Sequence, residues 1–332
     1  MTRVTVLGAG SWGTTLADLL ARKGHEVRLW AYEPDVAAAI NGQHENPVFL
    51  PGCGLAPALR AETDPVAATR GAELLVTVAP SHVLRRVVAA ARPALAAGAI
   101  VVSATKGIEP ESLALMSEVL RSALPGHPVC ALSGPSFALE VYQGQPTAVV
   151  AAAEEERAAR AAQELFATPR FRVYTHADVT GVELAGALKN VIAIAAGILD
   201  GLGLGNNPRA ALITRGLAEM TRLGVAMGAD PLTFAGLAGM GDLILTTTGA
   251  LSRNRALGVA LAHGETLAEY SAAHRSIAEG ATTARGALAL AARHGVELPI
   301  CAQVAEILFD GKPARQAVGD LMERTLKSEQ WR

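Results

Sequence analysis

A lysine and an asparagine stand side by side in an otherwise small and apolar segment of the chain, GALKNVIAIAAGILDG (186–201). A buried ammonium group is costly unless another group pairs with it, so most helical lysines point to solvent or lay their stems along apolar surface. On a helix, however, Lys189 has Ala185 and Gly186 among its neighbours, and these leave space for a ligand. We therefore expect Lys189 to project into a tight, partly desolvated pocket, where its pKa falls toward the range useful for proton transfer.

A second polar segment lies in a glycine-rich stretch, AGMGDLILTTTGALSRNRALG (238–258). Asp242 follows Gly239 and Gly241, and Ser252 suits the N-cap of the helix that follows it. Arg253 and Asn254 come next, and an arginine beside the amides of a helix N-terminus can clamp a phosphate or a carboxylate. The alternative for this stretch is an ordinary solvated loop.

The first apolar run of the chain ends in a glycine-rich loop, VTVLGAGSWG (4–13). In a GxGxxG loop between a strand and a helix, the first glycine permits the tight turn and the second lets a pyrophosphate approach the backbone. The third lets the helix pack on the strand. Gly8, Gly10 and Gly13 occupy these three positions, and the helix N-terminus that follows offers free N–H groups to phosphates. The loop predicts a dinucleotide-binding site.

The choice of dinucleotide depends on the end of the second apolar run, LWAYEPD (29–35), where the adenosine ribose is expected. Glu33 could accept a hydrogen bond from a ribose 2′-hydroxyl, and no arginine stands immediately at this turn to pair with a 2′-phosphate. The segment therefore favours NAD over NADP to a small degree. The alternative is that Glu33 faces solvent, one residue beyond the binding position.

Three later loops also follow apolar runs and are expected to face the cofactor, because ligands of doubly wound sheets bind at the carboxyl ends of the strands. The first of them is VTVAPSHVL (76–84). Lys106 stands in the loop SATKGIEPES (103–112). Gly134 and Ser136 stand in LSGPSFALE (132–140). A lysine beside a turn is often only a surface residue, and the position at a strand end is what makes Lys106 a candidate.

Short apolar runs with β-branched residues alternate with helical patterns up to about residue 176, which predicts a parallel sheet with right-handed crossovers. The predicted strands are 3–8, 26–31, 73–79, 99–105 and 128–133, with 148–152 and 171–175 as further strands at an edge, and the helices between them include 12–23, 81–96 and 110–123. Helical periodicity then covers 178–199, 208–227, 252–263, 265–273, 281–294 and 299–310. We predict an α/β chain, with an N-terminal Rossmann-type doubly wound sheet in residues 1–177. A mainly α-helical domain follows in 178–332, with a ligand cleft between the two.

Composition excludes several classes of protein. Of the 332 residues, 50% are hydrophobic and 18% charged, which excludes a disordered chain. The formal net charge of −2 argues against a nucleic-acid-binding surface. Three dispersed cysteines predict reduced thiols in the cytoplasm, and the scattered histidines predict no metal site. The first residues run directly into a strand pattern without a signal peptide, and Lys189 makes its apolar segment a poor membrane span.

With these segments in view, the chain resembles the bacterial NAD(P)-dependent glycerol-3-phosphate dehydrogenases from end to end. The combination of the KNVIAI and GDL…SRNR motifs is more specific than the glycines, because other Rossmann dehydrogenases lack it. The motifs that carry the resemblance are GAGSWGT (8–14), APSH (79–82), ATKG (104–107), SGPSFA (133–138), GALKNVIAI (186–194), ALITRGLAEM (211–220), GADP (228–231), GMGDLILT (239–246), SRNR (252–255) and AEG (278–280).

The resemblance implies that the chain interconverts sn-glycerol 3-phosphate and dihydroxyacetone phosphate, supplying glycerol 3-phosphate for phospholipid synthesis. It implies Lys189 as the proton acceptor, with Lys106 and Asp242 beside it. The substrate-binding positions it implies are Lys106, Gly134, Ser136, Lys189, Asn190, Asp242, Ser252, Arg253 and Asn254. The cofactor-binding positions are the three glycines with Ser11, Trp12, Tyr32, Glu33, Lys106, Ala138, Arg253, Ile277 and Glu279. Many bacterial members carry a basic residue at the ribose-side turn, where this chain has Tyr32 and Glu33.

Two other functions remain open on the residues alone. One is a dehydrogenase for a β-hydroxy acid or a sugar-acid phosphate, in which Arg253 would bind a carboxylate. The other is a module that binds NAD without chemistry, which the joint presence of the lysine, the aspartate and the RN pair argues against. An apolar helical domain is also compatible with a homodimer.

Overall fold

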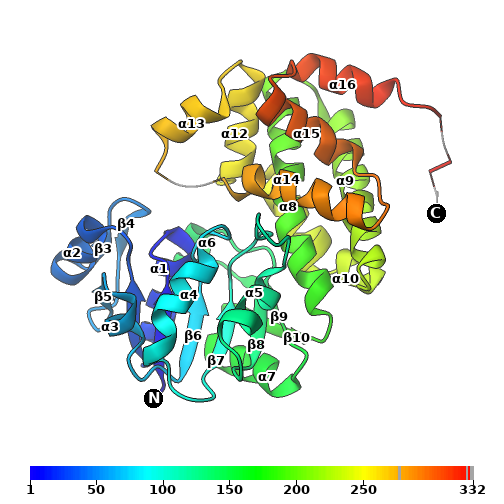
Figure 1. Cartoon of the computed structure of the whole chain (residues 1–332). Coiled ribbons are helices and arrows are strands. Elements are labelled where there is room, and N and C mark those ends of the chain that lie inside the picture. Colours follow the sequence, from blue (N-terminus) through cyan, green and yellow to red (C-terminus); the bar gives the residue numbers. More distant parts are fainter. Residues whose placement is uncertain (276–277, 327, 330–332) are drawn as a thin grey trace.

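The computed structural model describes residues 1–275, 278–326, 328 and 329. Among these residues, strands and helices alternate in the N-terminal part, and helices alone form the rest (Figure 1). The last strand, β10 (Phe171–His176), ends two residues before α8 (Val179–Gly201) begins. The prediction of an α/β sheet domain followed by helices is confirmed, and a domain boundary at residue 177 stays a prediction.

Within the described residues, eight strands form one sheet in the order β10-β9-β8-β7-β6-β1-β2-β5. The strands other than β10 are β1 (Arg3–Leu7), β2 (Glu26–Trp30), β5 (Arg60–Glu62), β6 (Leu74–Thr77), β7 (Ile100–Ser103), β8 (Val129–Ser133) and β9 (Thr147–Ala152). The chain leaves β1 for β2 on one side and later returns to place β6 on the other. The carboxyl ends of β1 and β6 therefore flank the switch point, where doubly wound sheets bind ligands.

The sheet is parallel, as expected, except at one pair of strands near an edge. From β5 to β8 every pair is parallel, but β9 runs antiparallel to β8, and β10 is parallel to β9. The connection from β8 to β9 holds only the short helix α6 (Ala138–Tyr142), which packs on α1 (Ser11–Arg22). Because α6 stays at the carboxyl edge of the sheet, β9 starts from that edge and runs back.

Both faces of the sheet are covered, which explains the continuous apolar runs in the strands. Val4 and Val6 of β1 belong to the core that α1 covers, together with α2 (Pro34–Gln43) and α7 (Glu156–Phe166). Leu7 and Leu75 belong to the opposite core, which α3 (Pro65–Thr69), α4 (Leu84–Ala91) and α5 (Met116–Ala123) cover.

Two of the predicted helices are shorter than expected. The segment predicted at 81–96 forms α4 and then a 3₁₀ turn, Arg92–Ala94, because Pro93 cannot continue the helix. The segment predicted at 110–123 becomes helical only at Met116, since Leu113 has a positive φ of 62° and Ile108 pairs with Leu115 in a β-bridge. The sequence patterns did not predict α2, β5, or the hairpin of β3 (Glu45–Asn46) and β4 (Leu50–Gly54).

The helical part is built around α8, whose residues from Gly181 to Leu199 are all buried. The helices around it are α9 (Asn206–Ala226), α10 (Pro231–Ala235), α11 (Asp242–Thr248), α12 (Arg253–Ala262), α13 (Leu267–Ala273), α14 (Glu279–Arg293), α15 (Pro299–Asp310) and α16 (Ala314–Met322). The backbones of α8 and α12 are in contact: a Cβ on Gly197 would lie 1.9 Å from the Arg255 carbonyl oxygen, and one on Gly258 2.0 Å from that of Ile194. Such close crossings explain why small residues outnumber aromatic ones.

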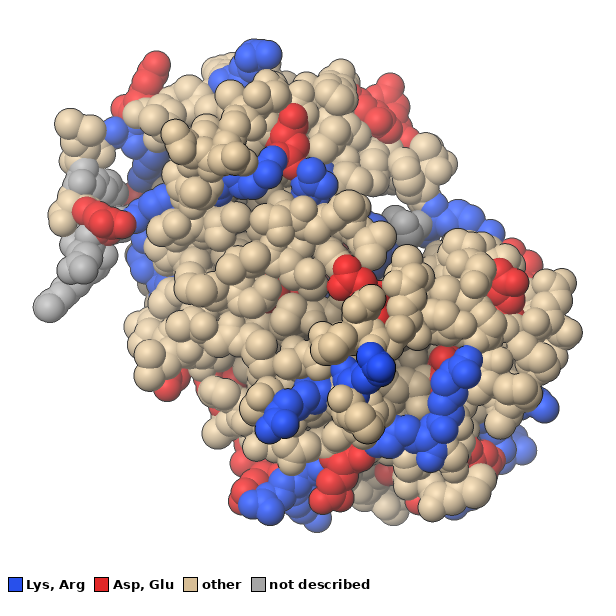
Figure 2. All heavy atoms as spheres, turned by 180° about the vertical axis from the view of Figure 1, so that it is seen from behind, with Lys and Arg blue, Asp and Glu red and all other residues tan. Residues whose placement is uncertain are grey.

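The structure also bears on the expectations about a membrane span, a nucleic-acid-binding surface and the cysteines. By length and composition α8 could span a membrane, but its apolar window is buried among the other elements, as the core helix of a globular fold is. On the face opposite to that of Figure 1, acidic and basic side chains are interspersed among large uncharged areas (Figure 2). The three cysteines are buried free thiols.

Candidate active site

A cleft of about 770 Å³ lies between the carboxyl edge of the sheet and the helical part. The loops that follow β1, β6 and β8 line it from the sheet, and residues of α8, α11 and α12 line it from the helices. The predicted location of a ligand cleft thus agrees with the structure. We call this space the interdomain cleft.

The glycine-rich loop has the geometry that phosphate binding needs. Gly8 has a φ of +122°, and a Cβ there would lie 2.9 Å from the backbone of Val78 and Ala79. A Cβ on Gly13 would lie 1.9 Å from the Gly8 carbonyl oxygen, so only glycine allows α1 to start this close to β1. Gly10, by contrast, has open space on its Cβ side among the described residues, and no side chain of theirs caps α1. The free amides of the helix N-terminus therefore face the cleft.

Two lysines meet one aspartate at the helical end of the cleft. The Lys189 Nζ donates to Asp242 Oδ1 at 2.7 Å and to the Thr246 Oγ1 at 2.7 Å. The Lys106 Nζ donates to the other carboxylate oxygen of Asp242 at 2.5 Å and to the Gly134 carbonyl at 3.3 Å. Lys189 and Asp242 are 7% and 1% exposed. We call Lys106, Lys189 and Asp242 the lysine–aspartate cluster.

Burial and charge shift the pKa values inside this cluster. Burial lowers the pKa of Lys189 to about 8; Asp242 opposes this fall, and the positive charges of Lys106 and Arg253 add to it. For Asp242, burial alone would raise the pKa, but the two ammonium groups outweigh burial and hold its pKa below the usual value. The cluster thus contains an ionised acid and an amine that titrates near neutral pH, as expected from the small neighbours of Lys189.

A π-helical turn, Leu237–Gly241, delivers Asp242 to this position as the first residue of α11. Gly239 in that turn has no room for a side chain, because a Cβ would lie 2.1 Å from the Phe234 carbonyl oxygen. One helical turn later, Thr246 donates to the Asp242 carbonyl at 2.7 Å while it accepts from Lys189. The predicted site residues did not include Thr246.

The second basic group of the cleft lies at the start of α12. Ser252 is the N-cap, since its hydroxyl accepts from the Arg255 amide at 3.2 Å, and Arg253 lines the cleft as the first helical residue. The Asn254 side chain donates to the Asn190 side chain at 3.0 Å and accepts from the Gly280 amide at 2.9 Å. This amide chain holds α8, α12 and α14 together and keeps Arg253 near Lys189.

The loops that follow the strands of the sheet form the rest of the wall of the interdomain cleft. The Gly134 carbonyl accepts from the Ser136 hydroxyl at 3.0 Å as well as from Lys106. On the other side, the Ser81 hydroxyl donates to Glu279 Oε2 at 2.8 Å, and burial raises the pKa of Glu279. Ser81 is the first residue of the helix predicted at 81–96; α4 itself begins at Leu84, and the Ser81 hydroxyl ties the β6 loop to α14.

Most of the predicted site residues line the interdomain cleft. Those that line it are Gly8, Gly10, Ser11, Trp12, Gly13, Tyr32, Glu33, Lys106, Ser136, Ala138, Lys189, Asn190, Asp242, Ser252, Arg253, Asn254 and Glu279. Of the predicted residues that the structure describes, Gly134 does not line the cleft. It contributes through its carbonyl, which accepts a hydrogen bond from Lys106. Ile277 lies outside the described residues.

Several residues of the cleft were not predicted. Phe49 reaches it from the β3–β4 hairpin, which carries too few residues for a strand pattern. His82 and Arg86 follow β6, and Arg275 comes from the segment after α13. His82 was not singled out, but it belongs to the 76–84 loop that was expected to face the cofactor. Nothing local marks Arg275, whose contact is with Asp35, 240 residues away.

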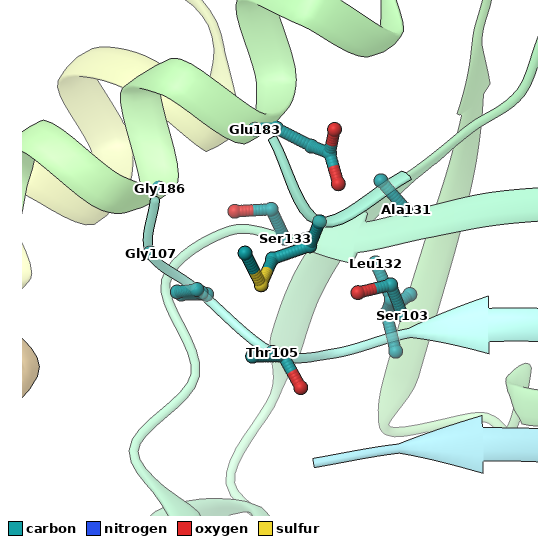
Figure 3. A pocket seen from close by; sticks show the side chains of 10 residues that line it. Ser103, Thr105, Gly107, Ala131, Leu132, Ser133, Glu183 and Gly186 are labelled. Carbon is teal, nitrogen blue, oxygen red and sulfur yellow. The ribbon is translucent and has the colours of Figure 1, made fainter. Parts of the chain in front are cut away.

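A second, small cavity has Lys106 in its lining, and its volume of about 10 Å³ is close to the space that one water molecule needs (Figure 3). Glu183 of α8 faces it, and its carboxylate accepts from the amide and the hydroxyl of Ser117 at 2.9 and 2.6 Å. Burial raises the pKa of Glu183 to about 7, although the bonds from Ser117 oppose the shift. The Ser103 and Ser133 hydroxyls have no hydrogen-bond partner in the described part of the chain. We call this space the back cavity.

A phosphate-binding glycine loop at the switch point of a doubly wound sheet, facing a buried lysine–aspartate pair, defines a nucleotide-dependent dehydrogenase. Two family models match the chain: NAD-dependent glycerol-3-phosphate dehydrogenase N-terminus over residues 3–159, and the C-terminus of the same family over 178–319. The chain therefore belongs to the NAD(P)-dependent glycerol-3-phosphate dehydrogenase family, as its motifs predicted.

Individual relatives agree with this assignment. The chain is 56% identical to the glycerol-3-phosphate dehydrogenase [NAD(P)+] of Geobacter sp. (strain M21) over 98% of each chain, and 56% identical to that of Geobacter sulfurreducens over 99% of each. The crystal structure of glycerol-3-phosphate dehydrogenase from Coxiella burnetii superposes with a TM-score of 0.94, at 41% identity, over 97% of this chain and 99% of that one. A ketopantoate reductase from Ralstonia eutropha, at 20% identity and a TM-score of 0.61, shares the fold alone.

Proposed function

We propose that the chain interconverts sn-glycerol 3-phosphate and dihydroxyacetone phosphate by hydride transfer with NAD or NADP. The observation that carries this proposal is the buried Lys189–Asp242 pair, which faces the same cleft as the glycine-rich loop. Relatives that are 56% identical over nearly the whole chain bear the name of this activity. The reaction would supply glycerol 3-phosphate for phospholipid synthesis in the cytoplasm.

The glycine-rich loop fits a dinucleotide. The open space at Gly10 and the uncapped start of α1 among the described residues suit a pyrophosphate. The amides of Ser11 and Trp12 would hold the phosphates, and Glu33 would accept from a ribose hydroxyl. When bound, the nicotinamide ring supplies the acceptor or donor of the hydride.

Lys189 is proposed as the group that moves the proton. A neutral amine has two N–H groups and one lone pair, and the bonds to Asp242 and Thr246 use both N–H groups. The lone pair is then free to take the hydroxyl proton of glycerol 3-phosphate as the hydride leaves the same carbon. In the reverse direction the Lys189 ammonium polarises the ketone and returns the proton.

The other members of the lysine–aspartate cluster act through position and charge. Asp242 holds Nζ of Lys189 in place and stabilises its protonated form, while Lys106 adds positive charge that opposes protonation. We propose that Lys106 also binds substrate, because its ammonium and the Ser136 hydroxyl both stand at the Gly134 carbonyl.

Arg253 is proposed to bind the substrate phosphate. Its guanidinium lies at the N-terminus of α12, where backbone amides also favour an anion. Since the Asn254 side chain already bonds to Asn190 and to the Gly280 amide, its contribution would come from its spare amide hydrogen and its backbone N–H. Asn190, with the same spare hydrogen, would assist from α8.

A steady-state comparison of substrates and variants tests the proposal. Dihydroxyacetone phosphate, ketopantoate and small β-keto acids are offered with NADH and with NADPH, and only the first is expected to be reduced efficiently. The kcat of Lys189→Ala should fall by about 10²–10⁴-fold, the usual contribution of a general acid or base. Near-normal turnover in Lys189→Ala would instead assign the proton transfer to Lys106. In that case a parallel Lys106→Ala variant should show the loss of kcat. Hydride transfer to none of these ketones would favour a module that binds the coenzyme without chemistry.

A further inference from the structure

An arginine from the helical part reaches the turn where the adenosine ribose is expected. Arg275 follows α13, and its guanidinium donates to the Asp35 carboxylate at 3.3 Å. Asp35 lies in the first turn of α2, two residues after Glu33. Arg275, Tyr32 and Glu33 all line the interdomain cleft. The local sequence has no basic residue at this turn, but the fold brings Arg275 to it from a distant segment.

The ion pair with Asp35 does little to explain why an arginine stands there. The Arg275 and Asp35 side chains are 56% and 61% exposed, and the contact uses a single donor at a long distance. Exposed pairs of this kind contribute little to stability. A guanidinium has five N–H donors in a planar fork, so most of those on Arg275 remain available to a ligand in the cleft.

We propose that Arg275 binds the 2′-phosphate of NADP, so that the ribose-side turn accepts both coenzymes. Glu33 serves the 2′-hydroxyl of NAD, and the guanidinium of Arg275 serves the phosphate that replaces it. A phosphate carries more negative charge than one carboxylate and matches the fork with two parallel bonds. Asp35 competes with the phosphate for the Arg275 guanidinium.

One other cation in the cleft competes for this role. Arg86, in the first turn of α4, also lines the cleft and is exposed. It comes from the sheet side and follows β6, whereas Arg275 is bonded to the helix that follows β2. The 2′-phosphate is expected at the end of β2, which favours Arg275.

The test uses two fragments that differ only in the phosphate, adenosine 5′-monophosphate and adenosine 2′,5′-bisphosphate, with binding measured by calorimetry. In Arg275→Gln, the affinity for the bisphosphate should fall by about tenfold or more and that for the monophosphate should change by less than about twofold. In Asp35→Asn, the affinity for the bisphosphate should rise, because the competitor is gone. Arg315→Gln, on the exposed side of α16, is the matched control and should leave both affinities unchanged.

The inference is overturned if Arg275→Gln leaves the ratio of the two affinities unchanged or weakens both fragments equally. It is also overturned if Arg86→Gln, and not Arg275→Gln, selectively weakens the bisphosphate. This inference rests on the proposed coenzyme site. Binding of adenosine 5′-monophosphate tests the coenzyme site by itself, separately from the role of Arg275. Binding of the monophosphate with an unchanged ratio refutes the role of Arg275 alone, whereas wild-type protein that binds neither fragment refutes the coenzyme site as well.

Discussion

Replacing Asp242 with asparagine removes the carboxylate that binds both buried lysines. The asparagine would keep the size of the side chain but lose the charge that stands 2.7 Å from Lys189 Nζ and 2.5 Å from Lys106 Nζ. Without it, two positive charges remain in one poorly solvated place. The protonated form of Lys189 loses its partner, so its pKa must fall below the value of about 8 that it has in the intact site.

The size of this shift can be estimated from the geometry. Two unit charges 2.7 Å apart attract with about 6 kcal/mol at an effective dielectric constant of about 20, and each 1.36 kcal/mol corresponds to about one pKa unit. Relaxation and water entry reduce such effects, and an opposite charge at close range shifts a pKa by about 1–3 units in practice. We therefore expect the Lys189 pKa to fall by about 1–3 units in Asp242→Asn.

The assay is the pH dependence of kcat for reduction of dihydroxyacetone phosphate. This direction needs the Lys189 ammonium, so the wild-type kcat should decrease as the pH rises through about 8, and oxidation of glycerol 3-phosphate should show the opposite trend. In Asp242→Asn the decrease in reduction should occur about 1–3 pH units lower. At neutral pH the variant would thus be a poor reductase that recovers in acid.

Asp200→Asn is the matched control. Asp200 is a mostly buried carboxylate that pairs with Arg209 and Arg255, away from the lysine–aspartate cluster. Its loss should lower the thermal stability without moving the pH profile. An unshifted or upward-shifted profile in Asp242→Asn, in protein that is still folded by circular dichroism, would refute the assignment of Lys189 as the titrating group.

Three further outcomes are expected. Arg253→Ala should raise the KM for dihydroxyacetone phosphate by about 10–100-fold with kcat within a few-fold, because charge-assisted hydrogen bonds contribute about 1.5–3 kcal/mol; a lower kcat at unchanged KM would contradict the clamp. Gly13→Ala should weaken NADH binding measured by fluorescence, since the new Cβ would lie 1.9 Å from the Gly8 carbonyl and displace the loop; unchanged binding would show that the loop is not the phosphate site. Glu183, with a pKa raised to about 7 by burial, makes the fold less stable as the pH rises from about 4.5 to about 7, by up to about 3 kcal/mol. Glu183→Gln, compared with wild type by urea unfolding at both ends of that range, should remove this part of the pH dependence, and an identical slope in both proteins would contradict it.

Much of the fold could be predicted because its patterns are local. The strands β1, β2, β6, β7 and β8 are buried on both faces and read as continuous apolar runs, and the helices α8, α9 and α12 to α15 follow the period of 3.6. The helices α10, α11 and α16 were not predicted. The patterns failed where a local rule was absent or broken. The β3–β4 hairpin is too short to show alternation, and the positive φ of Leu113 delays α5 until Met116.

No local pattern could predict the direction of β9 either. Parallel and antiparallel strands have the same apolar run when both faces are buried, so the alternation of strand and helix suggested a uniform sheet. The packing of α6 on α1 decides that β9 returns antiparallel, and this contact joins residues more than 100 positions apart, as the bond from Thr15 to the Ala138 carbonyl shows.

The sequence by itself determined which residues of this protein have chemistry to offer. The spacing of Gly8, Gly10 and Gly13 and the small neighbours of Lys189 are consequences of backbone geometry within one or two turns. Only the tertiary structure decided the pairs: Asp242 with Lys189 across 53 residues, and Arg275 with Asp35 across 240. The physical reason is that a charge acts over a few ångströms of space, and the packing of whole elements, which no local pattern encodes, sets which side chains come that close.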